Sequence, residues 1–396
     1  MAQITTFEDF LKRILEIVFW LLIALPMILV PVIFLIVPYI PILLPTGRIL
    51  TPNEAFVILL DPFMTIAVLA PFFATPWFKA IVFPGFTWAA LIATFLGLYE
   101  RKLLAKIQIR VGPLYAGRTE GILQPFADLF KLLFKEMIIP TKADRSFFVA
   151  IPFASAAIAS ALLAIIPISE FWVIARSSVG LLIVFAIIGF FPIVVLLAAW
   201  ASNSKYPFIG GLRALHQMVA YEIPMILSTL GIVILTGTLD LVEIVRAQAG
   251  GMFLILLPVG AIVFFITLLA ELERIPFDMP EADTEIVAGW LTEYSGMLFG
   301  VILGIAVYIK LYAFGALFTV LFLGGWLGPS FLPDVVWFFL KTFLVLTLLI
   351  LPRAIFPRYR MDLMLRIGWA RLLVLAFINL FIALLLVQFG VVGPGV

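Results

Sequence analysis

The sequence contains no cysteine and a single histidine, His216. The chain therefore has no disulfide, no thiolate metal site and no iron–sulfur cluster of its own, and it cannot hold a haem between two histidines. We find no nucleotide-binding loop, catalytic triad or metal-ligand spacing, and we expect no flavin. Any electron transfer would then take place on a partner or on a diffusible cofactor. We expect His216 to be a hydrogen-bonded structural residue.

Charge is also scarce. Only 12% of the residues are charged and 64% are hydrophobic, and the mean hydropathy is +1.24. Apolar runs of about 20 residues, the length that spans a bilayer as a helix, recur along the chain. Lipid cannot satisfy free backbone groups, so these runs are predicted to be helices. The fold class is all-α, a polytopic integral membrane protein.

The apolar runs predict nine spans or ten. Residues 55–76 carry Asp61, Pro62 and Pro71, and this run either crosses the membrane or lies at its surface. The run from Ile14 to Leu44 is too long for the core of a cleaved signal peptide. The remaining predicted helices lie near 15–44, 80–100, 147–167, 179–201, 217–237, 253–272, 294–323, 334–352 and 370–391.

Lysine and arginine set the predicted orientation, because cytoplasmic loops are enriched in them. Segment 101–145 is the richest, and cations also gather in 202–216 and 353–369. Alternation of the spans adds 273–293 to the same side. These four segments are predicted to share the cytoplasmic face of the membrane.

Residues 271–293 combine seven carboxylates with one cation, Arg274. Charge beside membrane segments is costly and by default functional. We expect a helix to start near Asp278 with Pro280 in its first turn, which places later acids at its positive end. Crowded carboxylates hold protons near neutrality; the alternative is a solvated acidic loop. The carboxylates are Glu271, Glu273, Asp278, Glu281, Asp283, Glu285 and Glu293.

Two relationships follow from helical spacing. On the helix predicted to start near Asp278, Glu281 and Glu285 would share one face, and on the preceding helix Glu271 could pair with Arg274 three residues later. Glu222, near the start of another predicted span, is either a proton site or the structural partner of a cation.

Two further stretches border the apolar runs. Residues 100–110, ERKLLAKIQIR, are basic and could serve as an anchor to anionic lipid. In 119–138 the spacing of Asp128, Lys131 and Lys135 predicts an amphipathic helix at the membrane interface. Such a helix could merely pack on the bilayer, or it could wall an opening from the lipid toward a site.

The motifs ERKLLAKIQIRVGP, GILQPFADLFKLLFKE, SNSKYPFIGGLRALHQMVAYEIP, ERIPFDMPEADTEIVAGWLTEYSGM, LGGW and PRYRMDLMLRIGW occur in order along most of the chain. Together they resemble the NuoH family, whose members are subunit 1, or the H subunit, of proton-pumping NADH–quinone oxidoreductase, respiratory complex I. The resemblance implies an eight-helix membrane core over 79–396, with 1–78 as an extension carrying one or two apolar segments.

The resemblance also implies a function. The family forms the lipid-facing tunnel for quinone and carries no redox centre, while iron–sulfur subunits and antiporter-like membrane subunits are its partners. Nucleic acid is not expected as a partner, whereas membrane lipid is. The resemblance implies an energy-transducing membrane, most simply a prokaryotic cell membrane, with a thylakoid or other energy-transducing membrane as the alternative. The residues that match quinone-passage positions are Arg101, Arg110, Asp128, Arg274 and Asp278. The residues that match the acidic funnel coupling quinone reduction to proton translocation are Glu222, Glu271, Glu281, Asp283, Glu285 and Glu293.

The chain departs from the family in places. The usual glutamate of an AEY-like motif is replaced by Ala306, and Lys310, one turn later, is a candidate to supply charge instead. The stretch GPLYAGRTEG is one residue longer than usual. The sequence leaves open the electron donor, NAD(P)H or ferredoxin, and the quinone type. Alternatives are the anchor of an energy-converting hydrogenase or F420-type dehydrogenase, a purely structural anchor, or a stand-alone ion transporter.

Overall fold

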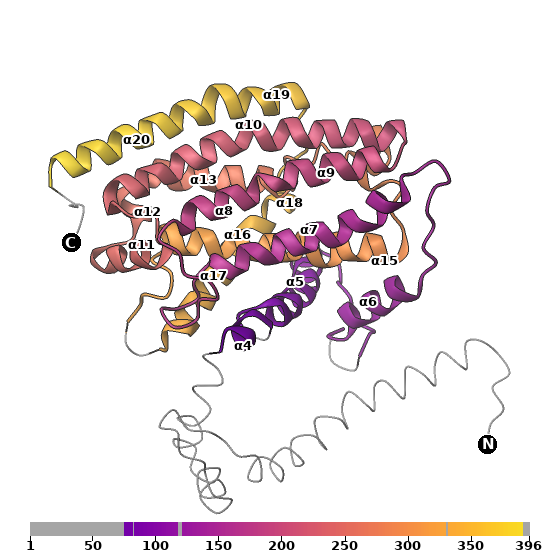
Figure 1. Cartoon of the computed structure of the whole chain (residues 1–396), viewed down its shortest axis with the longest axis horizontal. Coiled ribbons are helices and arrows are strands. Elements are labelled where there is room, and N and C mark those ends of the chain that lie inside the picture. The colour runs from indigo at the N-terminus through magenta and orange to yellow at the C-terminus, as the bar shows by residue number, and fades with distance from the viewer. Residues whose placement is uncertain (1–74, 82, 118–120, 330–331, 391–396) are drawn as a thin grey trace, which may run out of the picture. The chain divides into compact units, whose positions relative to one another are not determined.

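The structure, a computed structural model, describes residues 75–81, 83–117, 121–329 and 332–390. These residues form helices joined by short connections, without a strand among them (Figure 1). The α-helices in the first half are α4 (Pro76–Ile81), α5 (Phe86–Ile107), α6 (Gln124–Phe134), α7 (Arg145–Ile165), α8 (Gly180–Ile188), α9 (Phe190–Ala201) and α10 (Lys205–Thr236). Those that follow are α11 (Leu241–Ala247), α12 (Phe253–Leu256), α13 (Pro258–Glu271), α14 (Asp283–Ile286), α15 (Gly296–Phe299), α16 (Val307–Phe322), α17 (Asp334–Ile350), α18 (Pro352–Ile355), α19 (Met361–Arg366) and α20 (Leu373–Gln388).

Four short segments wind differently from an α-helix. Two are single 3₁₀ turns, η2 (Gln248–Gly250) and η3 (Gly289–Leu291). Two are π-helical and lie inside longer helices, η4 (Gly300–Ala306) between α15 and α16, and η5 (Ile367–Leu372) between α19 and α20. π-Helical turns are rare and often occur at functional sites.

Two helices form the centre of the bundle. Helix α10 packs against α9, α13 and α20, and α16 packs against α5, α7 and α17 (Figure 1). Every residue of α16 from Ile309 to Phe322 is buried, as expected of a helix that is apolar all round. Close approach of α20 to α10 and α13 depends on glycine, because a Cβ on Gly260 would lie 2.5 Å from Oδ1 of Asn379.

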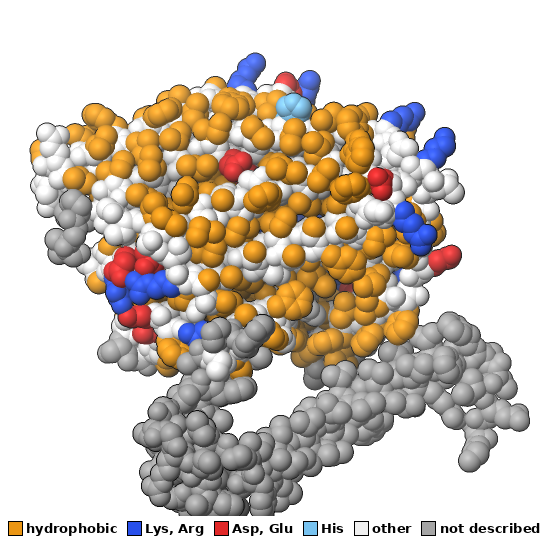
Figure 2. Space-filling view, in the orientation of Figure 1, with side chains coloured by type: hydrophobic (Ala, Val, Ile, Leu, Met, Phe, Trp, Pro, Cys, Tyr) orange, Lys and Arg blue, Asp and Glu red, His pale blue; other side chains and the backbone are white. Residues whose placement is uncertain are grey.

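The apolar surface agrees with a membrane location. Seven helical segments of the described chain are long and apolar enough to cross a bilayer, and the shorter apolar helix α13 accompanies them. Hydrophobic side chains cover most of the face seen in Figure 2, and most charged side chains lie near its margins. The sequence prediction of an all-α polytopic membrane protein is confirmed.

The four segments predicted to share one side of the membrane contact one another. The side chain of Asn203 donates to the carbonyl of Lys142 at 2.8 Å, and Arg213 pairs with Glu285 at 2.6 Å. The backbone N–H of Tyr359 donates to the carbonyl of Pro276 at 3.0 Å. These bonds join 101–145, 202–216, 273–293 and 353–369 at one end of the bundle.

Several predicted helix ends were wrong. Helix α10 begins at Lys205, not near 217, and the helix predicted from 370 begins at Met361 as α19. Helix α5 covers 86–107 rather than 80–100, so Glu100 and Arg101 are helical. Each helix continues beyond its apolar run, because small or apolar residues on one face still pack while the polar residues lie on the other. The run 179–201 is broken in two at Gly189.

The prediction of a helix that starts near Asp278 was also wrong. Helix α14 is a single turn that begins at Asp283, and Glu281 precedes it. Glu281 and Glu285 therefore do not share a helical face. The chain turns after α14, where Val287 has φ +66° and Gly289 has φ +56°. These left-handed conformations end the helix after one turn.

Some predictions lie outside the described residues. The apolar runs 15–44 and 55–74, and the side chain of Arg118 within the longer GPLYAGRTEG stretch, are not described. The division of the chain into an extension of residues 1–78 and a core of residues 79–396 stays a prediction. So does the placement of α6 at a membrane interface, although the predicted helix is present over Gln124–Phe134.

Candidate functional site

A cleft of about 520 Å³ separates α5, α6 and η4, and the segment 272–281 closes it. Helix α6 forms one wall with Gln124, Pro125, Asp128, Leu129 and Leu132. Helix α5 forms the opposite wall, and Phe299, Gly300, Leu303 and Gly304 add apolar surface from the π-helical region. The predicted amphipathic helix therefore lines this cleft, and whether the cleft opens to lipid stays a prediction. All five residues matched to quinone-passage positions line this cleft: Arg101, Arg110, Asp128, Arg274 and Asp278.

The inner part of the cleft holds a buried ion pair that the sequence did not predict. Glu100 of α5 is 1% exposed and Arg274 is 8% exposed, and Nη1 of Arg274 lies 2.8 Å from Oε1 of Glu100. Arg353 donates to the same Oε1. The guanidinium of Arg274 also lies over the ring of Tyr308 at 5.7 Å. Arg274 thus pairs with Glu100 and not with Glu271, because α13 ends at Glu271 and the chain turns there.

The outer part of the cleft is more exposed. Arg101, next to Glu100 but on the outside of α5, pairs with Asp128 of α6, and Gln124 donates to the other oxygen of Asp128 at 2.8 Å. Arg110 follows α5 and bonds to Gln108 at 2.7 Å. The cleft therefore extends from exposed arginines to a buried carboxylate.

Three acids of the 271–293 segment line the cleft, namely Glu273, Asp278 and Glu281. Asp278 accepts a hydrogen bond from Arg358 at 2.7 Å, and Glu281 lines the cleft beside it. The cleft thus carries acids and arginines from segments that are distant in the sequence, and it holds charges of both signs around an otherwise apolar space.

A smaller cavity of about 50 Å³, hereafter the chamber, lies inside the bundle. It is lined from α7, α9, α10, α13, η3, η4 and α16, and Ala306 is part of its wall. Glu271, fully buried, and Lys310 face it; Nζ of Lys310 lies 3.7 Å from Oε2 of Glu271 and donates to the backbone carbonyl of Glu271 at 2.6 Å. Ala306 and Lys310 line the same cavity, and the role of Lys310 in supplying charge there stays a prediction.

Glu273 belongs to both spaces, since it lines the cleft and the chamber. Its Oε2 accepts a hydrogen bond from Nε1 of Trp290 at 3.2 Å. Burial raises the pKa of the Glu273 carboxyl to about 7, and nearby Lys310 opposes this rise. A carboxyl with a pKa near neutrality can both take up and release a proton under physiological conditions.

The remaining acids lie at varied distances from these spaces. Glu222 of α10 faces the break between α8 and α9, where a Cβ on Gly189 would lie 3.0 Å from its Oε1. Glu285 pairs with Arg213 at 2.6 Å near the surface. Glu293 is partly buried beside Tyr294 and lines neither the cleft nor the chamber. Asp283 starts α14, and its side chain is outside the described part.

The sequence predictions did not assign a site role to Glu100, Glu273 or Arg353. Glu100 opens the ERK motif, and its position one residue before two cations gave no sign that it points inward. Glu273 was counted among the acids of its segment without a specific role. His216 bonds through Nδ1 to the carbonyl of Leu212 at 2.7 Å, as expected for a structural histidine.

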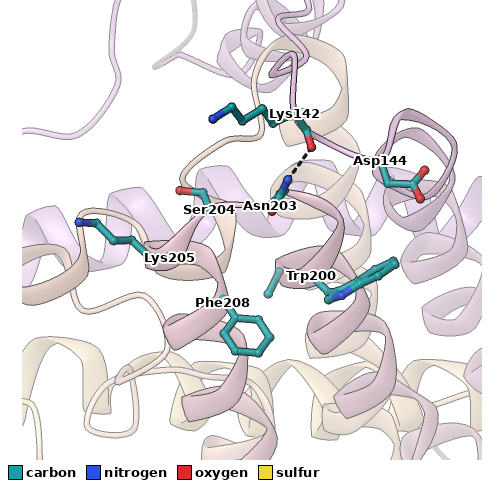
Figure 3. Close-up of a pocket in the computed structure, with 8 residues that line it drawn as sticks. Lys142, Asp144, Trp200, Asn203, Ser204, Lys205 and Phe208 are labelled. Carbon is teal, nitrogen blue, oxygen red and sulfur yellow. Dashed lines mark hydrogen bonds between the residues drawn. The ribbon is translucent and has the colours of Figure 1, made fainter.

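A separate groove of about 490 Å³ lies at the same end of the bundle, beside the turn between α9 and α10 (Figure 3). The bond from Asn203 to the carbonyl of Lys142 crosses it. The side chains of Lys142 and Lys205 point to the same side in this view, and Trp200 and Phe208 form its apolar part (Figure 3). The groove contains no residue that the sequence predicted to be functional.

Together these features define a polytopic helical membrane protein in which a charged cleft adjoins a buried acid–lysine pair. Comparison with known proteins gives the family. The family model for NADH dehydrogenase matches residues 79–384, and the chain belongs to this family.

Individual relatives show which members of the family this chain is similar to. The H subunit of NADH-quinone oxidoreductase from Geobacillus sp. (strain WCH70) is 42% identical over 321 residues, covering 79% of this chain and 96% of the relative. The protein of the same name from Anoxybacillus flavithermus is 42% identical over 323 residues, covering 81% and 95%. That from Bacillus cytotoxicus is 43% identical over 318 residues, covering 78% and 95%. The resemblance to the NuoH family is confirmed.

Proposed function

We propose that this chain is the membrane subunit of a complex I-type NADH–quinone oxidoreductase, in which the cleft admits quinone and the acidic groups couple its reduction to proton translocation. The partners would be peripheral iron–sulfur subunits and antiporter-like membrane subunits. The observation that carries the proposal is the cleft, where Arg101, Arg274 and Asp278 gather around apolar walls.

The chemistry of the cleft fits an amphipathic substrate. Leu129, Leu132 and Leu303 offer apolar contact to an isoprenoid tail, and the inner charged groups can donate hydrogen bonds to quinone oxygens. Arginine retains its charge in a buried site, so Arg274 can stabilise the negative charge that develops on a quinone as it accepts electrons. The chain itself would supply binding and electrostatics, while electrons come from a partner.

The acids supply the second part of the proposal. Reduction of a quinone to quinol consumes two electrons and two protons. Glu273 and Glu281 line the cleft, and Glu271 lies behind it in the chamber. A change of charge in the cleft therefore acts on carboxylates at short range and in a low dielectric, where coupling between protonation states is strong.

Gly304 offers a direct test of quinone access. It lines the cleft, and no atom lies within 4 Å of a Cβ built on it. Gly304→Trp adds bulk at the lining of the cleft from a position where a Cβ meets no other atom, and Gly304→Ala is the matched control. In the assembled complex we expect Gly304→Trp to lower kcat/KM for quinone by about tenfold or more, a loss of about 1.4 kcal/mol.

A photoreactive quinone analogue provides the second measurement. It should label the cleft residues in the wild type and in Gly304→Ala, and much less in Gly304→Trp. Unchanged kinetics in Gly304→Trp, together with labelling elsewhere, would refute the proposal that quinone uses this cleft. A nickel–iron hydrogenase found with the purified protein would instead favour the hydrogenase alternative.

A further inference from the structure

The wall between the cleft and the chamber is thin. Three residues, Leu272, Glu273 and Val307, line both spaces. Leu272 and Val307 are apolar, so Glu273 is the one polar side chain among the three. A proton that passes from one space to the other by this route meets the carboxyl of Glu273.

The chamber holds groups that the substrate cannot touch. Glu271 is 0% exposed, and neither of its carboxylate oxygens has a hydrogen-bond partner among the described residues. Lys310 is 7% exposed and lies over the ring of Phe191 at 4.1 Å. A fully buried carboxylate with unsatisfied oxygens is costly unless water or a proton satisfies them.

The chamber can hold water. Its volume of about 50 Å³ exceeds the ~10–15 Å³ that one water requires, and Glu271, Glu273 and Lys310 offer the polar partners that an internal water needs. Hydrogen-bonded water would then join the carboxyl of Glu273 to the carboxylate of Glu271. The chamber is thus both roomy and polar at the face where the acids lie.

We propose that Glu273 transfers protons between the cleft and the chamber, and that Lys310 is the fixed cation that allows Glu271 to receive them. The inference rests on the proposed function of the cleft. In one transfer, a proton leaves the carboxyl of Glu273, passes through the water of the chamber and binds to the carboxylate of Glu271. Glu273 becomes a carboxylate and takes a new proton from the cleft, and Lys310 stays an ammonium throughout.

Lys310 acts through the position of its positive charge and does not itself transfer a proton. Its ammonium lies 3.7 Å from Oε2 of Glu271 and offsets the charge of whichever carboxylate is ionised. Two other charged groups act on these carboxylates. Glu222 of α10 acts on Glu271, and Asp278, in the segment after α13, acts on Glu273. Without the lysine, two neighbouring buried carboxylates would repel, and Glu271 would stay protonated and unable to accept.

The test uses the complete complex in liposomes, with Glu273→Gln, Lys310→Met and Lys310→Arg. Two control variants lie at the opposite end of the bundle. Lys341→Met removes an ammonium that donates to the carbonyls of Leu323, Gly325 and Leu327, and Glu243→Gln changes an acid paired with Arg176 and Arg246. Each variant is first checked for assembly on a native gel.

We expect Glu273→Gln and Lys310→Met to lower proton pumping by about tenfold or more, the scale of a lost proton-transfer group. Lys310→Arg should recover much of the loss because it restores the cation. In Glu273→Gln the rate of proton pumping should no longer change with pH near neutrality. The infrared difference spectrum on quinone reduction should lose the C=O band of a protonated carboxyl in the same variant. Both controls should keep the wild-type profile.

Wild-type pumping, pH profile and infrared band in Glu273→Gln and Lys310→Met would overturn the inference. This result differs from failure of the proposed function. If quinone does not use the cleft, the photoreactive analogue labels other residues and Gly304→Trp leaves kcat/KM for quinone unchanged. If only the inference fails, the analogue still labels the cleft and Gly304→Trp still slows quinone reduction.

Discussion

Nη1 of Arg274 lies 2.8 Å from Oε1 of Glu100, and both side chains are almost completely buried. This pair joins α5 to the segment that follows α13, so it fixes the inner boundary of the cleft. Removing one partner of a buried pair leaves the other charge unpaired, which costs more than replacing both partners by apolar groups.

Glu100→Ala should therefore destabilise the protein by about 3–5 kcal/mol, because Arg274 remains buried without its carboxylate. The double variant Glu100→Leu with Arg274→Leu should recover a large part of this loss. The midpoint of thermal unfolding of the purified complex measures both effects. A single variant as stable as the wild type would show that the pair is not buried as described.

Glu273 makes stability depend on pH. Its pKa is about 7 in the folded protein and near 4.5 in the unfolded chain. Between these values the folded protein holds a proton that the unfolded chain has lost, so the free energy of unfolding falls as pH rises from about 4.5 to about 7. The total loss is at most about 3 kcal/mol at 1.36 kcal/mol per pKa unit.

Thermal unfolding at about pH 5 and about pH 8 checks this prediction. Glu273→Gln should lessen the difference between the two midpoints, because an amide does not titrate. Glu243→Gln, in the exposed ion cluster at the other end of the bundle, is the matched control and should leave the difference as it is. If the difference between the midpoints at the two pH values were the same in the wild type and both variants, the raised pKa of Glu273 would be contradicted.

Gly210 should not tolerate a side chain. A Cβ there would lie 2.6 Å from the backbone nitrogen of Trp290 and 2.8 Å from Gly289, so α10 and η3 would have to separate. We expect Gly210→Ala to destabilise the complex by about 1–3 kcal/mol, as overpacking does. Trp290 would also move, and its bond to Glu273 would be lost.

Gly250→Ala is the control, because no atom lies within 4 Å of a Cβ at Gly250. Its thermal midpoint should stay within the range of ordinary surface substitutions, about 0.5 kcal/mol from the wild type. If Gly210→Ala were as stable as this control, the close contact between α10 and η3 would be wrong.

The apolar runs predicted the spans well, since a membrane demands long hydrophobic helices whatever the tertiary contacts. They did not predict where α10 and α19 begin. Lys205 and Arg360 lie where hydropathy has already fallen, yet the backbone there is helical or about to become so. The residues that pack near these ends lie on one face, Gly210 and Gly211 in α10 and Met364 in α19, whereas hydropathy averages over both faces.

The candidate site was predictable in composition but not in pairing. The motifs identified Arg274 and Asp278 as site residues, and both line the cleft. Spacing in the sequence suggested that Arg274 pairs with Glu271, whereas tertiary packing gives it Glu100. The turns at Glu273, with φ +51°, and at Gly289 depend on long-range contacts, so local helix rules failed in this segment.

The π-helical winding of Gly300–Ala306 has a consequence for how this protein can change over evolutionary time. Gly300 and Leu303 face the cleft, while Ala306 and Lys310 face the chamber, so one continuous helix serves two compartments. A π turn holds an additional residue relative to an α turn. Deletion of that additional residue would return the stretch to α winding and leave Lys310 nearly in register. Deletion of one residue of α16 between Val307 and Lys310 would instead rotate the rest of the helix by about 100° and turn Lys310 away from Glu271. The π turn is therefore the place where this helix can gain or lose a residue without separating the lysine from its carboxylate.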